Sequence, residues 1–282
     1  MGNKWNMIVD VAKCENCQNC FIATKDEHVG NDFPAYAAPQ PLHGHAWVDV
    51  RRKERGEHPI LDVHFMPVMC NQCDDAPCMK AARDGAVYKR RDGIVIIDPV
   101  KAKGQKQIVD ACPYGAVFWN EELQLPQKWI FDAHLLDSGW TRTRAEQVCP
   151  TGALHSVKIS DSEMTALAGR EHLRVLQPEL NTRPRVYYKN LHLMDRCFIA
   201  GTVVTRTDGR EECVAGAKIA LSRGGDQISV TACDTFGEFK FDMLEAGGGA
   251  YEIAVEASAQ RPVRRQVILD QSLYLGTIDL SN

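Results

Sequence analysis

The cysteines constrain this 282-residue chain more than any other feature, because eight of its eleven lie in the first 150 residues and follow a pattern. Two groups of three are closely spaced, and two single cysteines are each followed by proline. The first group is Cys14, Cys17 and Cys20, and the second is Cys70, Cys73 and Cys78. The single residues, Cys112 and Cys149, complete two sets of four.

The spacing of these thiols favours iron–sulfur clusters over zinc. Thiolates are the soft ligands that such clusters need, and a cubane cluster takes four of them. The C-x2-C-x2-C run that begins at Cys14 is typical of a ferredoxin loop, but its next ligand position is Thr24 instead of cysteine. A zinc ribbon would need a second C-x2-C pair about 15–20 residues further on, and none follows. The residues alone leave open which single cysteine completes which group of three.

Charge and hydropathy exclude several classes of partner. A net charge of −4 and a pI near 6.1 give no general attraction to nucleic acid. No apolar run approaches the roughly 18 residues of a membrane-spanning helix, and the first residues do not resemble a signal peptide. We therefore expect a cytoplasmic protein without membrane insertion, whose clustered thiols bind metal instead of forming disulfides. The basic residues at 51–55 are expected to form a solvated face or part of a partner interface.

Three short segments of the first half resemble one another. Residues 112–117 (CPYGAV) and 149–154 (CPTGAL) match closely, and residues 82–87 (ARDGAV) share the Gly-Ala-apolar ending with alanine in place of cysteine. We interpret them as one loop and turn that is used three times, once without its sulfur.

Hydrophobic periodicity predicts the elements that surround these loops. We expect strands over residues 7–11, 46–50 and 93–98, a helix over 161–176 capped by Ser162, and an extended segment over 177–190. The remainder of residues 30–67 is rich in Pro, His and Gly, and is expected to be irregular.

From about Cys197 the apolar residues alternate with a period of two. The alternating residues are Ala217, Ile219, Leu221, Phe239, Phe241, Met243, Tyr251, Ile253, Val255, Val267 and Leu269. Short strands between Gly-rich turns predict a small β-sandwich. We therefore expect an α+β chain with an iron–sulfur domain over residues 1–195 and an all-β domain over 196–282.

Residues 1–190 resemble the iron–sulfur (beta or small) subunits of the dimethyl sulfoxide reductase family of molybdopterin oxidoreductases, which have four ferredoxin-type motifs. Within that family the chain is similar to small subunits of the pyrogallol–phloroglucinol transhydroxylase type and of related anaerobic aromatic (resorcinol-type) hydroxylases. The resemblance rests on Asp26-Glu27-His28, on residues 183–190 (RPRVYYKN), and on residues 234–241 and 250–255, which look like a Cna-B or transthyretin-like fold. It implies a ferredoxin-like domain with degenerate ferredoxin repeats.

The resemblance also implies how the cysteines divide. In the family the first motif exchanges its last cysteine with the fourth, and the second with the third. Two 4Fe–4S clusters follow. One would be held by Cys14, Cys17, Cys20 and Cys149. The other would be held by Cys70, Cys73, Cys78 and Cys112.

The remaining ligand positions of the four motifs then form two complete lost sets. One is Thr24, Trp129, Asp132 and Ala145, and the other is Ala82, Ala102, Gln105 and Ile108. Because oxygen is a harder ligand than sulfur, we expect Trp129 to fill the emptied volume and neither Thr24 nor Asp132 to ligate metal.

The family further implies a heterodimer with a large catalytic subunit that carries the molybdopterin cofactor and hydroxylates or transhydroxylates a phenolic ring. This chain would then carry electrons and have no catalytic residues of its own. Two alternatives stay open: the same role in another molybdenum reductase, and a scaffold protein whose β-domain is the working part. The scattered histidines and Cys197, Cys213 and Cys233 are expected to be structural or free.

Overall fold

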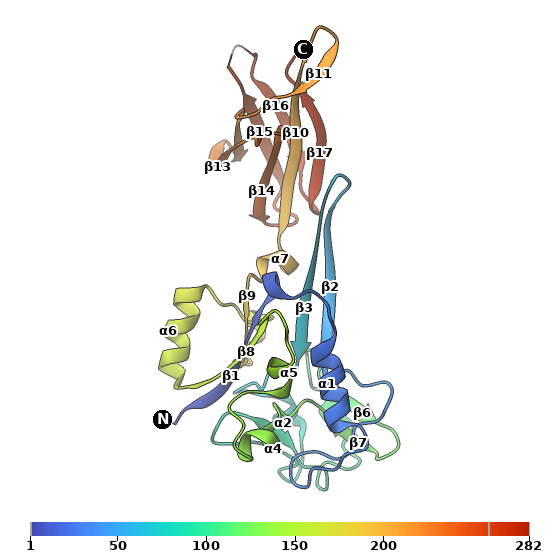
Figure 1. Cartoon of the computed structure of the whole chain (residues 1–282). Helices are drawn as coiled ribbons and strands as arrows, with labels where there is room; N and C mark the ends of the chain where they lie inside the picture. The colour runs from blue at the N-terminus through green and yellow to red at the C-terminus, as the bar shows by residue number, and fades with distance from the viewer. Residues whose placement is uncertain (1, 259, 282) are drawn as a thin grey trace. The chain divides into compact units, whose positions relative to one another are not determined.

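The computed structural model describes residues 2–258 and 260–281. The chain forms two compact units (Figure 1), one of Met1–Arg52 with Phe65–Leu191 and the other of Lys53–His64 with His192–Asn282. The second unit therefore includes a segment, residues 53–64, that the sequence analysis placed in the first domain. Within the described residues, none of the helices combines the length and the apolar content that a bilayer crossing requires.

A three-stranded sheet lies at the centre of the first unit. Its middle strand β1 (Lys4–Asp10) pairs antiparallel with β8 (Leu154–Ile159) and parallel with β9 (Val186–Lys189). Residues 5–9 of β1 are buried on both faces, which explains why apolar residues run on there without alternation. The strand predicted over residues 7–11 is thus confirmed, and it leads through a 3₁₀ turn, η1 (Val11–Lys13), directly into the first cysteine loop.

Three hairpins supply the other strands of this unit, and the outer part of the first hairpin, residues 53–64, belongs to the second unit. They are β2 (Val48–Glu57) with β3 (Ile60–Met69), β4 (Val87–Lys89) with β5 (Val95–Ile97), and β6 (Phe118–Asn120) with β7 (Leu125–Gln127). The strands predicted near residues 46–50 and 93–98 correspond to the start of β2 and to β5. The expectation that the rest of 30–67 is irregular is confirmed before residue 48 and wrong after residue 50, where β2 and β3 form a long hairpin. Several consecutive residues of β2 are exposed and charged, so no apolar alternation marks them in the sequence.

The helices of the first unit are short. They are α1 (Asn19–His28), α2 (Pro77–Ala81), α3 (Gln107–Asp110), α4 (Ala133–Asp137), α5 (Arg144–Gln147) and α6 (Asp161–Glu171). Helix α6 confirms the predicted helix, with two corrections. Its cap is Ser160 and not Ser162, because Ser160 and Glu163 form a reciprocal capping box. It ends at Glu171, where His172 takes a left-handed conformation.

The segment predicted to be extended over 177–190 is regular at both ends. A 3₁₀ turn, η2 (Pro178–Leu180), opens it, and β9 closes it. Proline fits the first position of such a turn because its missing N–H is not needed there.

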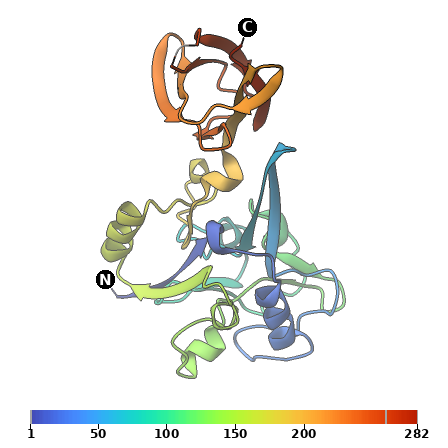
Figure 2. The same cartoon turned by 45° about the horizontal axis from the view of Figure 1, so that its top comes forward.

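The second unit contains two four-stranded sheets. In the first, β10 (Cys197–Thr207) pairs with β11 (Arg210–Cys213), β14 (Glu238–Leu244) and β17 (Leu273–Asp279). The second has the order β13 (Asp226–Ala232), β12 (Lys218–Arg223), β15 (Ala250–Glu256), β16 (Val263–Ile268). A short helix, α7 (His192–Asp195), precedes them. Figure 2 views this unit more nearly along its strands and shows the sheets on either side of a common interior.

One hydrophobic core lies between these two sheets. It contains Ile199 and Ile278 from the first sheet and Leu221 and Ile253 from the second. All but one of the alternating residues singled out in the sequence are buried in it. The exception is Met243, which is 62% exposed. Its φ of 64° and a register shift between β10 and β14 interrupt the alternation, so that Leu244 packs against the core instead.

A buried arginine fastens the hairpin segment 53–64 to the sheets of the second unit. The Arg55 guanidinium donates to both carboxylate oxygens of Asp242, at 2.8 and 3.0 Å, and to Asp62 at 2.9 Å. Its side chain is 1% exposed, and it lies over the Phe198 ring. The basic run at 51–55 is therefore not a wholly solvated face, because its last member is a buried ion-pair partner.

Neighbouring positions are adapted to this contact. Gly56 has a φ of +81°, and a Cβ there would collide with the Phe198 ring and the Ile60 carbonyl. Burial would raise the pKa of Asp62, but hydrogen bonds from Lys240 and the attraction of Arg55 outweigh it and lower that pKa. Both features keep the arginine–aspartate cluster ionised and closely packed.

Arg55→Ala should destabilise the second unit by about 3–5 kcal/mol, because it leaves buried carboxylates unpaired. The matched control is Arg264→Ala, which removes the exposed Arg264–Glu252 pair and should cost roughly 0–1 kcal/mol. Denaturant unfolding of the full chain, followed with a probe in this unit, measures both. Equal effects of the two substitutions would contradict the role given to Arg55.

Candidate metal centres

The first group of three cysteines lies on the short path from β1 to α1. Cys14 caps η1, and Cys20 lies in the first turn of α1. Asn16 and Gln18 between them have φ values of 57° and 62°, so the loop turns sharply twice. A loop of this shape directs several side chains toward one centre, as cluster binding requires.

Cys149 lies at the same place, although it follows α5 more than a hundred residues downstream. It lines one small cavity together with the first three cysteines. Val50 and Pro67 supply apolar walls. Helices α1 and α5 pack together there, and the Asn19 side chain donates to the Val148 carbonyl at 3.4 Å. The structure thus brings together the four residues of the first implied set.

The second implied set surrounds a separate cavity. Its lining includes Cys70, Cys73, Cys78 and Cys112, together with the apolar residues Val95 and Val117. Cys70, Cys73 and Cys78 are 7–8% exposed. Cys73, Cys78 and Val95 belong to a hydrophobic core cluster against which Cys112 packs. This cavity is accordingly drier than the first, in which Cys17 is exposed.

The two Cys-Pro loops have a common geometry. In each, the glycine has a φ of 63–65° and its N–H points back to the cysteine carbonyl, at 3.2 Å for Gly115 and 3.4 Å for Gly152. The following alanine N–H donates to the cysteine sulfur, at 3.3 Å from Ala153 to Cys149. A corresponding backbone hydrogen bond from Ala116 reaches Cys112 and lowers its pKa against the larger opposing effect of burial. N–H groups that point at a ligand sulfur stabilise the thiolate.

The cysteine-free segment at 82–87 makes a similar turn. Gly85 has a φ of 66°, and the chain enters β4 directly after it, as it enters β6 and β8 after the other two loops. The likeness of the three segments in sequence is therefore accompanied by a likeness in backbone conformation.

Burial makes several of these thiols weak acids in the absence of positive charge. It raises the pKa of Cys20 and of Cys73 to about 12, and that of Cys78 to about 11. Their neighbouring cysteines raise these values further by repulsion between thiolates. Four thiols that are buried so close together suit a polynuclear cation, whose charge holds all four as thiolates.

A site for a single metal ion has a different geometry from a site for a cluster, because all its ligands must meet at one point. Across residues 2–258 and 260–281, no three His, Cys, Asp or Glu side chains converge closely enough to hold one metal ion. A 4Fe–4S cluster presents a separate iron to each cysteine, so its ligands surround a volume and do not meet at a point. Two cavities that are each lined by four cysteines fit this description.

A network of charges around the buried Arg185 holds the second cysteine loop in place. Arg185 donates to Asp74 at 2.7 Å and to Asp161 at 2.8 Å, and its backbone N–H donates to the Asn71 carbonyl at 2.8 Å. Lys89 donates to the carbonyls of Gln72 and Cys73, both at 2.9 Å. These contacts explain one of the motifs noted in the sequence, since Arg185 belongs to residues 183–190.

A second buried lysine lies behind this loop. Lys128 is 1% exposed and donates to the carbonyls of Val95 and Trp129, at 2.5 and 3.1 Å. Its positive charge acts on the second set. Burial and the repulsion of Cys70 raise the pKa of Cys78, and the attraction of Lys128 opposes them as a smaller, lowering effect. Spacing of ligand residues gave no sign of this lysine, because it lies between β7 and the next loop and belongs to no motif.

The first of the two lost sets is gathered in one buried place. Thr24, Trp129, Asp132 and Ala145 are each at most 3% exposed. The Trp129 indole donates to Asp132 at 3.0 Å, and the other oxygen of Asp132 accepts from the Arg144 N–H at 2.8 Å. The Thr24 hydroxyl donates to the Cys20 carbonyl at 2.8 Å. Both oxygen-bearing side chains therefore bind protein groups, and Trp129 packs against Phe131.

The second lost set also lies together. Ala102 and Ile108 are fully buried in the core cluster that surrounds the second cysteine cavity, and Ala82 packs against it. Gln105 accepts from the Arg83 N–H at 2.8 Å and donates to the Lys101 carbonyl at 2.8 Å. Apolar packing and local hydrogen bonds therefore hold these four residues in place.

The residues Glu27 and His28 of the Asp26-Glu27-His28 motif pack beside the first lost set. Glu27 accepts from His134 at 2.8 Å and pairs with Arg144 at 3.2 Å. His28 is fully buried, 4.8 Å from the Trp47 ring between centroids and 3.8 Å from Asp132 between Nε2 and Oδ1. The motif thus joins α1 to α4 and α5, in agreement with the expectation that its histidine is structural.

Of the other candidates, the three cysteines of the second unit line neither cavity, and Cys213 is exposed while Cys233 is buried. His45 is buried against Phe118, and its Nε2 is 3.0 Å from the Trp119 carbonyl.

The fold and the two four-cysteine cavities define an iron–sulfur protein. In agreement, a family model described as a 4Fe-4S dicluster domain matches residues 61–159. The chain is 40% identical to the pyrogallol hydroxytransferase small subunit of Pelobacter acidigallici, over 98% of this chain and 99% of that one.

More distant relatives are subunits of other reductases. A subunit of tetrathionate reductase from Salmonella typhimurium is 31% identical over 67% of this chain and 73% of its own length. The arsenate respiratory reductase iron–sulfur subunit of a Shewanella strain is 30% identical over 47% and 52%. The chain belongs to this family, the iron–sulfur small subunits of molybdopterin oxidoreductases.

Trp129→Ala should destabilise the first unit by about 3–5 kcal/mol, because it empties a site that the surrounding elements cannot close. Trp140, which is half-buried, provides the control, and Trp140→Ala should cost clearly less. Thermal or denaturant unfolding of the cluster-loaded chain measures both. If Trp129→Ala lowered the free energy of unfolding by no more than Trp140→Ala, the role of Trp129 in filling this buried place would be contradicted.

Proposed function

We propose that this chain is the electron-transfer subunit of an anaerobic aromatic (phenolic) hydroxylase or transhydroxylase, in a heterodimer with a large subunit that carries the molybdopterin cofactor. The observation that carries the proposal is the presence of two cavities with four cysteines each, in a chain similar over nearly its whole length to the pyrogallol hydroxytransferase small subunit. The chain would contribute no catalytic residue. A cytoplasmic location belongs to the same proposal.

In this proposal each cavity holds one 4Fe–4S cluster. Cys14, Cys17, Cys20 and Cys149 would bind the first, and Cys70, Cys73, Cys78 and Cys112 the second. When bound, each cluster supplies a one-electron redox centre. The chain's own residues hold it through thiolates, exclude water from it with apolar walls, and direct backbone N–H groups at its ligand sulfurs.

The finer features of the architecture belong to the proposal as well. The similar turns at Gly85, Gly115 and Gly152 and the two gathered lost sets support degenerate ferredoxin repeats from which two clusters have been lost. Two sheets around one core support a Cna-B or transthyretin-like sandwich over residues 196–282, with the iron–sulfur domain over 1–195.

The ligand sets can be tested one at a time. Cys149→Ser should remove only the first cluster, and Cys112→Ser only the second, so that iron falls from about eight to about four per chain in each variant. The control is Cys213→Ser, which removes an exposed thiol of the second unit and should leave the iron content unchanged. Metal analysis and electron paramagnetic resonance of anaerobically purified complexes measure this. Loss of the same signal in both variants would refute the division into two sets.

The reduction potential of the second cluster should depend on Lys128. A buried positive charge favours the more negative, reduced state, so Lys128→Met should lower that midpoint potential by on the order of tens of millivolts. Lys80→Met is the matched control, because Lys80 lies on α2 near Cys78 but is 67% exposed and pairs with Asp75. A spectroscopic redox titration of the complex distinguishes the two. A potential that is unchanged in Lys128→Met would contradict the electrostatic role.

The class of substrate is tested with the intact heterodimer. Resorcinol or pyrogallol should change the oxidation state of the clusters under anaerobic conditions, as followed by the visible absorption of the complex. Similarity to a subunit of tetrathionate reductase favours a second candidate, a reductase for an inorganic oxyanion. Oxidation of the dithionite-reduced complex by tetrathionate, with no response to either phenol, would select that candidate instead.

A further inference from the structure

A cavity of about 320 Å³ in the first unit belongs to neither cysteine set. It is bounded by the start of β2, the end of β3, the loop after Cys112 and the segment before η2. Its volume lies within the range of about 300–1,000 Å³ that small-molecule sites have. Because all its lining residues belong to one compact unit, its shape is a property of that unit alone.

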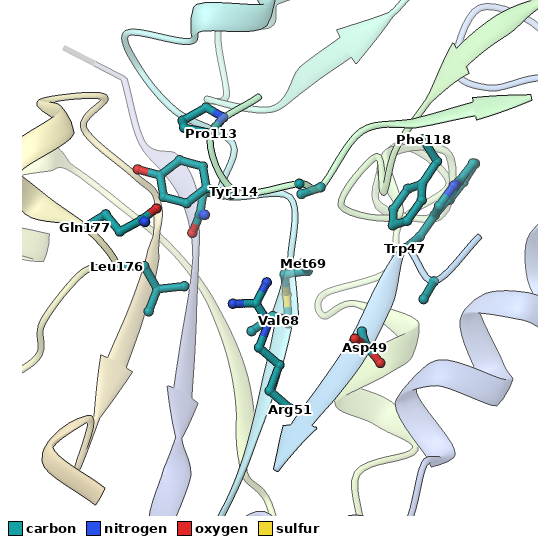
Figure 3. Close-up of a pocket in the computed structure, with 14 residues that line it drawn as sticks. Trp47, Asp49, Arg51, Val68, Met69, Pro113, Tyr114, Phe118, Leu176 and Gln177 are labelled. Carbon is teal, nitrogen blue, oxygen red and sulfur yellow. The ribbon is translucent and has the colours of Figure 1, made fainter. Parts of the chain in front are cut away.

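Three aromatic side chains line this cavity together with several apolar ones. Figure 3 shows Trp47 and Phe118 on one side and Tyr114 with Leu176 on the other, with Met69 and Val68 between them. Flat apolar walls on two sides suit a planar ring, which can stack on or meet the edges of such side chains.

Two side chains of the lining contain polar atoms without partners. Asn71 is 1% exposed, and neither its Nδ2 nor its Oδ1 has a hydrogen-bond partner among the described residues. The buried Trp47 Nε1 is likewise unpaired within the part of the chain that the structure describes. These atoms are buried behind the cavity surface, so the polar contacts of an occupant fall to the accessible charged side chains of the lining.

One strand adds opposite charges on the same side as Trp47. Side chains of a strand alternate, so Trp47, Asp49 and Arg51 face the cavity together. The guanidinium of Arg51 is directed toward the space between the two walls (Figure 3). It favours oxygen atoms with negative charge or lone pairs and disfavours a cationic occupant. Asp49 can accept from a hydroxyl at the same edge.

We propose that this cavity is a binding site for a small planar aromatic molecule that bears hydroxyl groups, that is, a polyhydroxylated phenol. Its ring would lie between the aromatic side chains, and its hydroxyl groups would meet Arg51 and Asp49. Asn71, Pro113 and Tyr114 line both this cavity and the second cysteine cavity, so a bound ring lies next to the second set.

The test uses the full-length, cluster-loaded chain and resorcinol as the probe, with isothermal titration calorimetry. Resorcinol should bind in the submillimolar range. Cyclohexane-1,3-diol, which carries the same hydroxyls on a ring that is not planar, should bind at least tenfold more weakly. Absence of resorcinol binding at millimolar concentration, or equal binding of the two compounds, would overturn the proposal.

Variants place the binding in this cavity. Arg51→Leu should weaken resorcinol binding at least tenfold, and Ala116→Phe, which fills the space, should abolish it. Arg52→Leu is the matched control on the opposite side of the strand and should bind within twofold of the parent chain. Unchanged binding to Arg51→Leu and Ala116→Phe would overturn the site. Iron content measured on the same samples shows whether the clusters are intact, so failure here is distinguishable from failure of the proposed function.

The competing occupant is a segment of the large subunit. Hydrogen exchange over residues 46–51 and 113–118 should be similar in the free chain and in the purified heterodimer, and resorcinol should slow it in both. Strong protection on heterodimer formation alone, with no effect of resorcinol, would assign the cavity to the partner polypeptide and overturn a small-molecule site.

Discussion

Two cavities, each lined by four cysteines, constrain the first unit more than any other feature. In each cavity one loop supplies three of the four cysteines and a remote Cys-Pro turn supplies the fourth, so the cavity can close only when distant parts of the chain meet. The three-stranded sheet makes this possible for the first set. β1 leads into the Cys14 loop while β8 leaves the Cys149 loop, and the two strands pair residue by residue from Lys4 with Ile159 to Val9 with Leu154. The second set closes over a shorter stretch, with Arg185 and Lys89 holding its loop against the sheet.

The two sets of positions that the family resemblance implies as lost ligands are occupied by groups that the fold satisfies. At the first set the Trp129 indole N–H is paired with Asp132 in the interior. At the second, alanine and isoleucine join the core that surrounds the second cysteine cavity. Under the proposed loss of two clusters, packing groups and paired polar groups stand in place of soft ligands, and the neighbouring turns are kept.

Much of the first unit follows from its sequence because ligand chemistry is local and specific. Cysteine spacing predicts iron–sulfur chemistry, and the shared Gly-Ala ending of residues 82–87, 112–117 and 149–154 predicts their similar backbone turns. The long β2–β3 hairpin did not follow, since its middle residues are charged and show no alternation. Arg55 and Met243 show the same limit: whether an arginine is buried, or whether a strand carries a bulge, is decided by contacts with partners far away in the chain. Lys128 belongs to no motif, and only the fold places it beside the second set.

The proposed long-range closure of the Cys14 loop by Cys149 can be tested with crystals of the complex, by recording diffraction above and below the iron absorption edge. We expect two compact groups of anomalous iron density on this chain, one bounded by Cys14, Cys17, Cys20 and Cys149 and the other by Cys70, Cys73, Cys78 and Cys112. Iron at Thr24, Trp129, Asp132 and Ala145, or a bond from Cys112 to the group at Cys14, would contradict it.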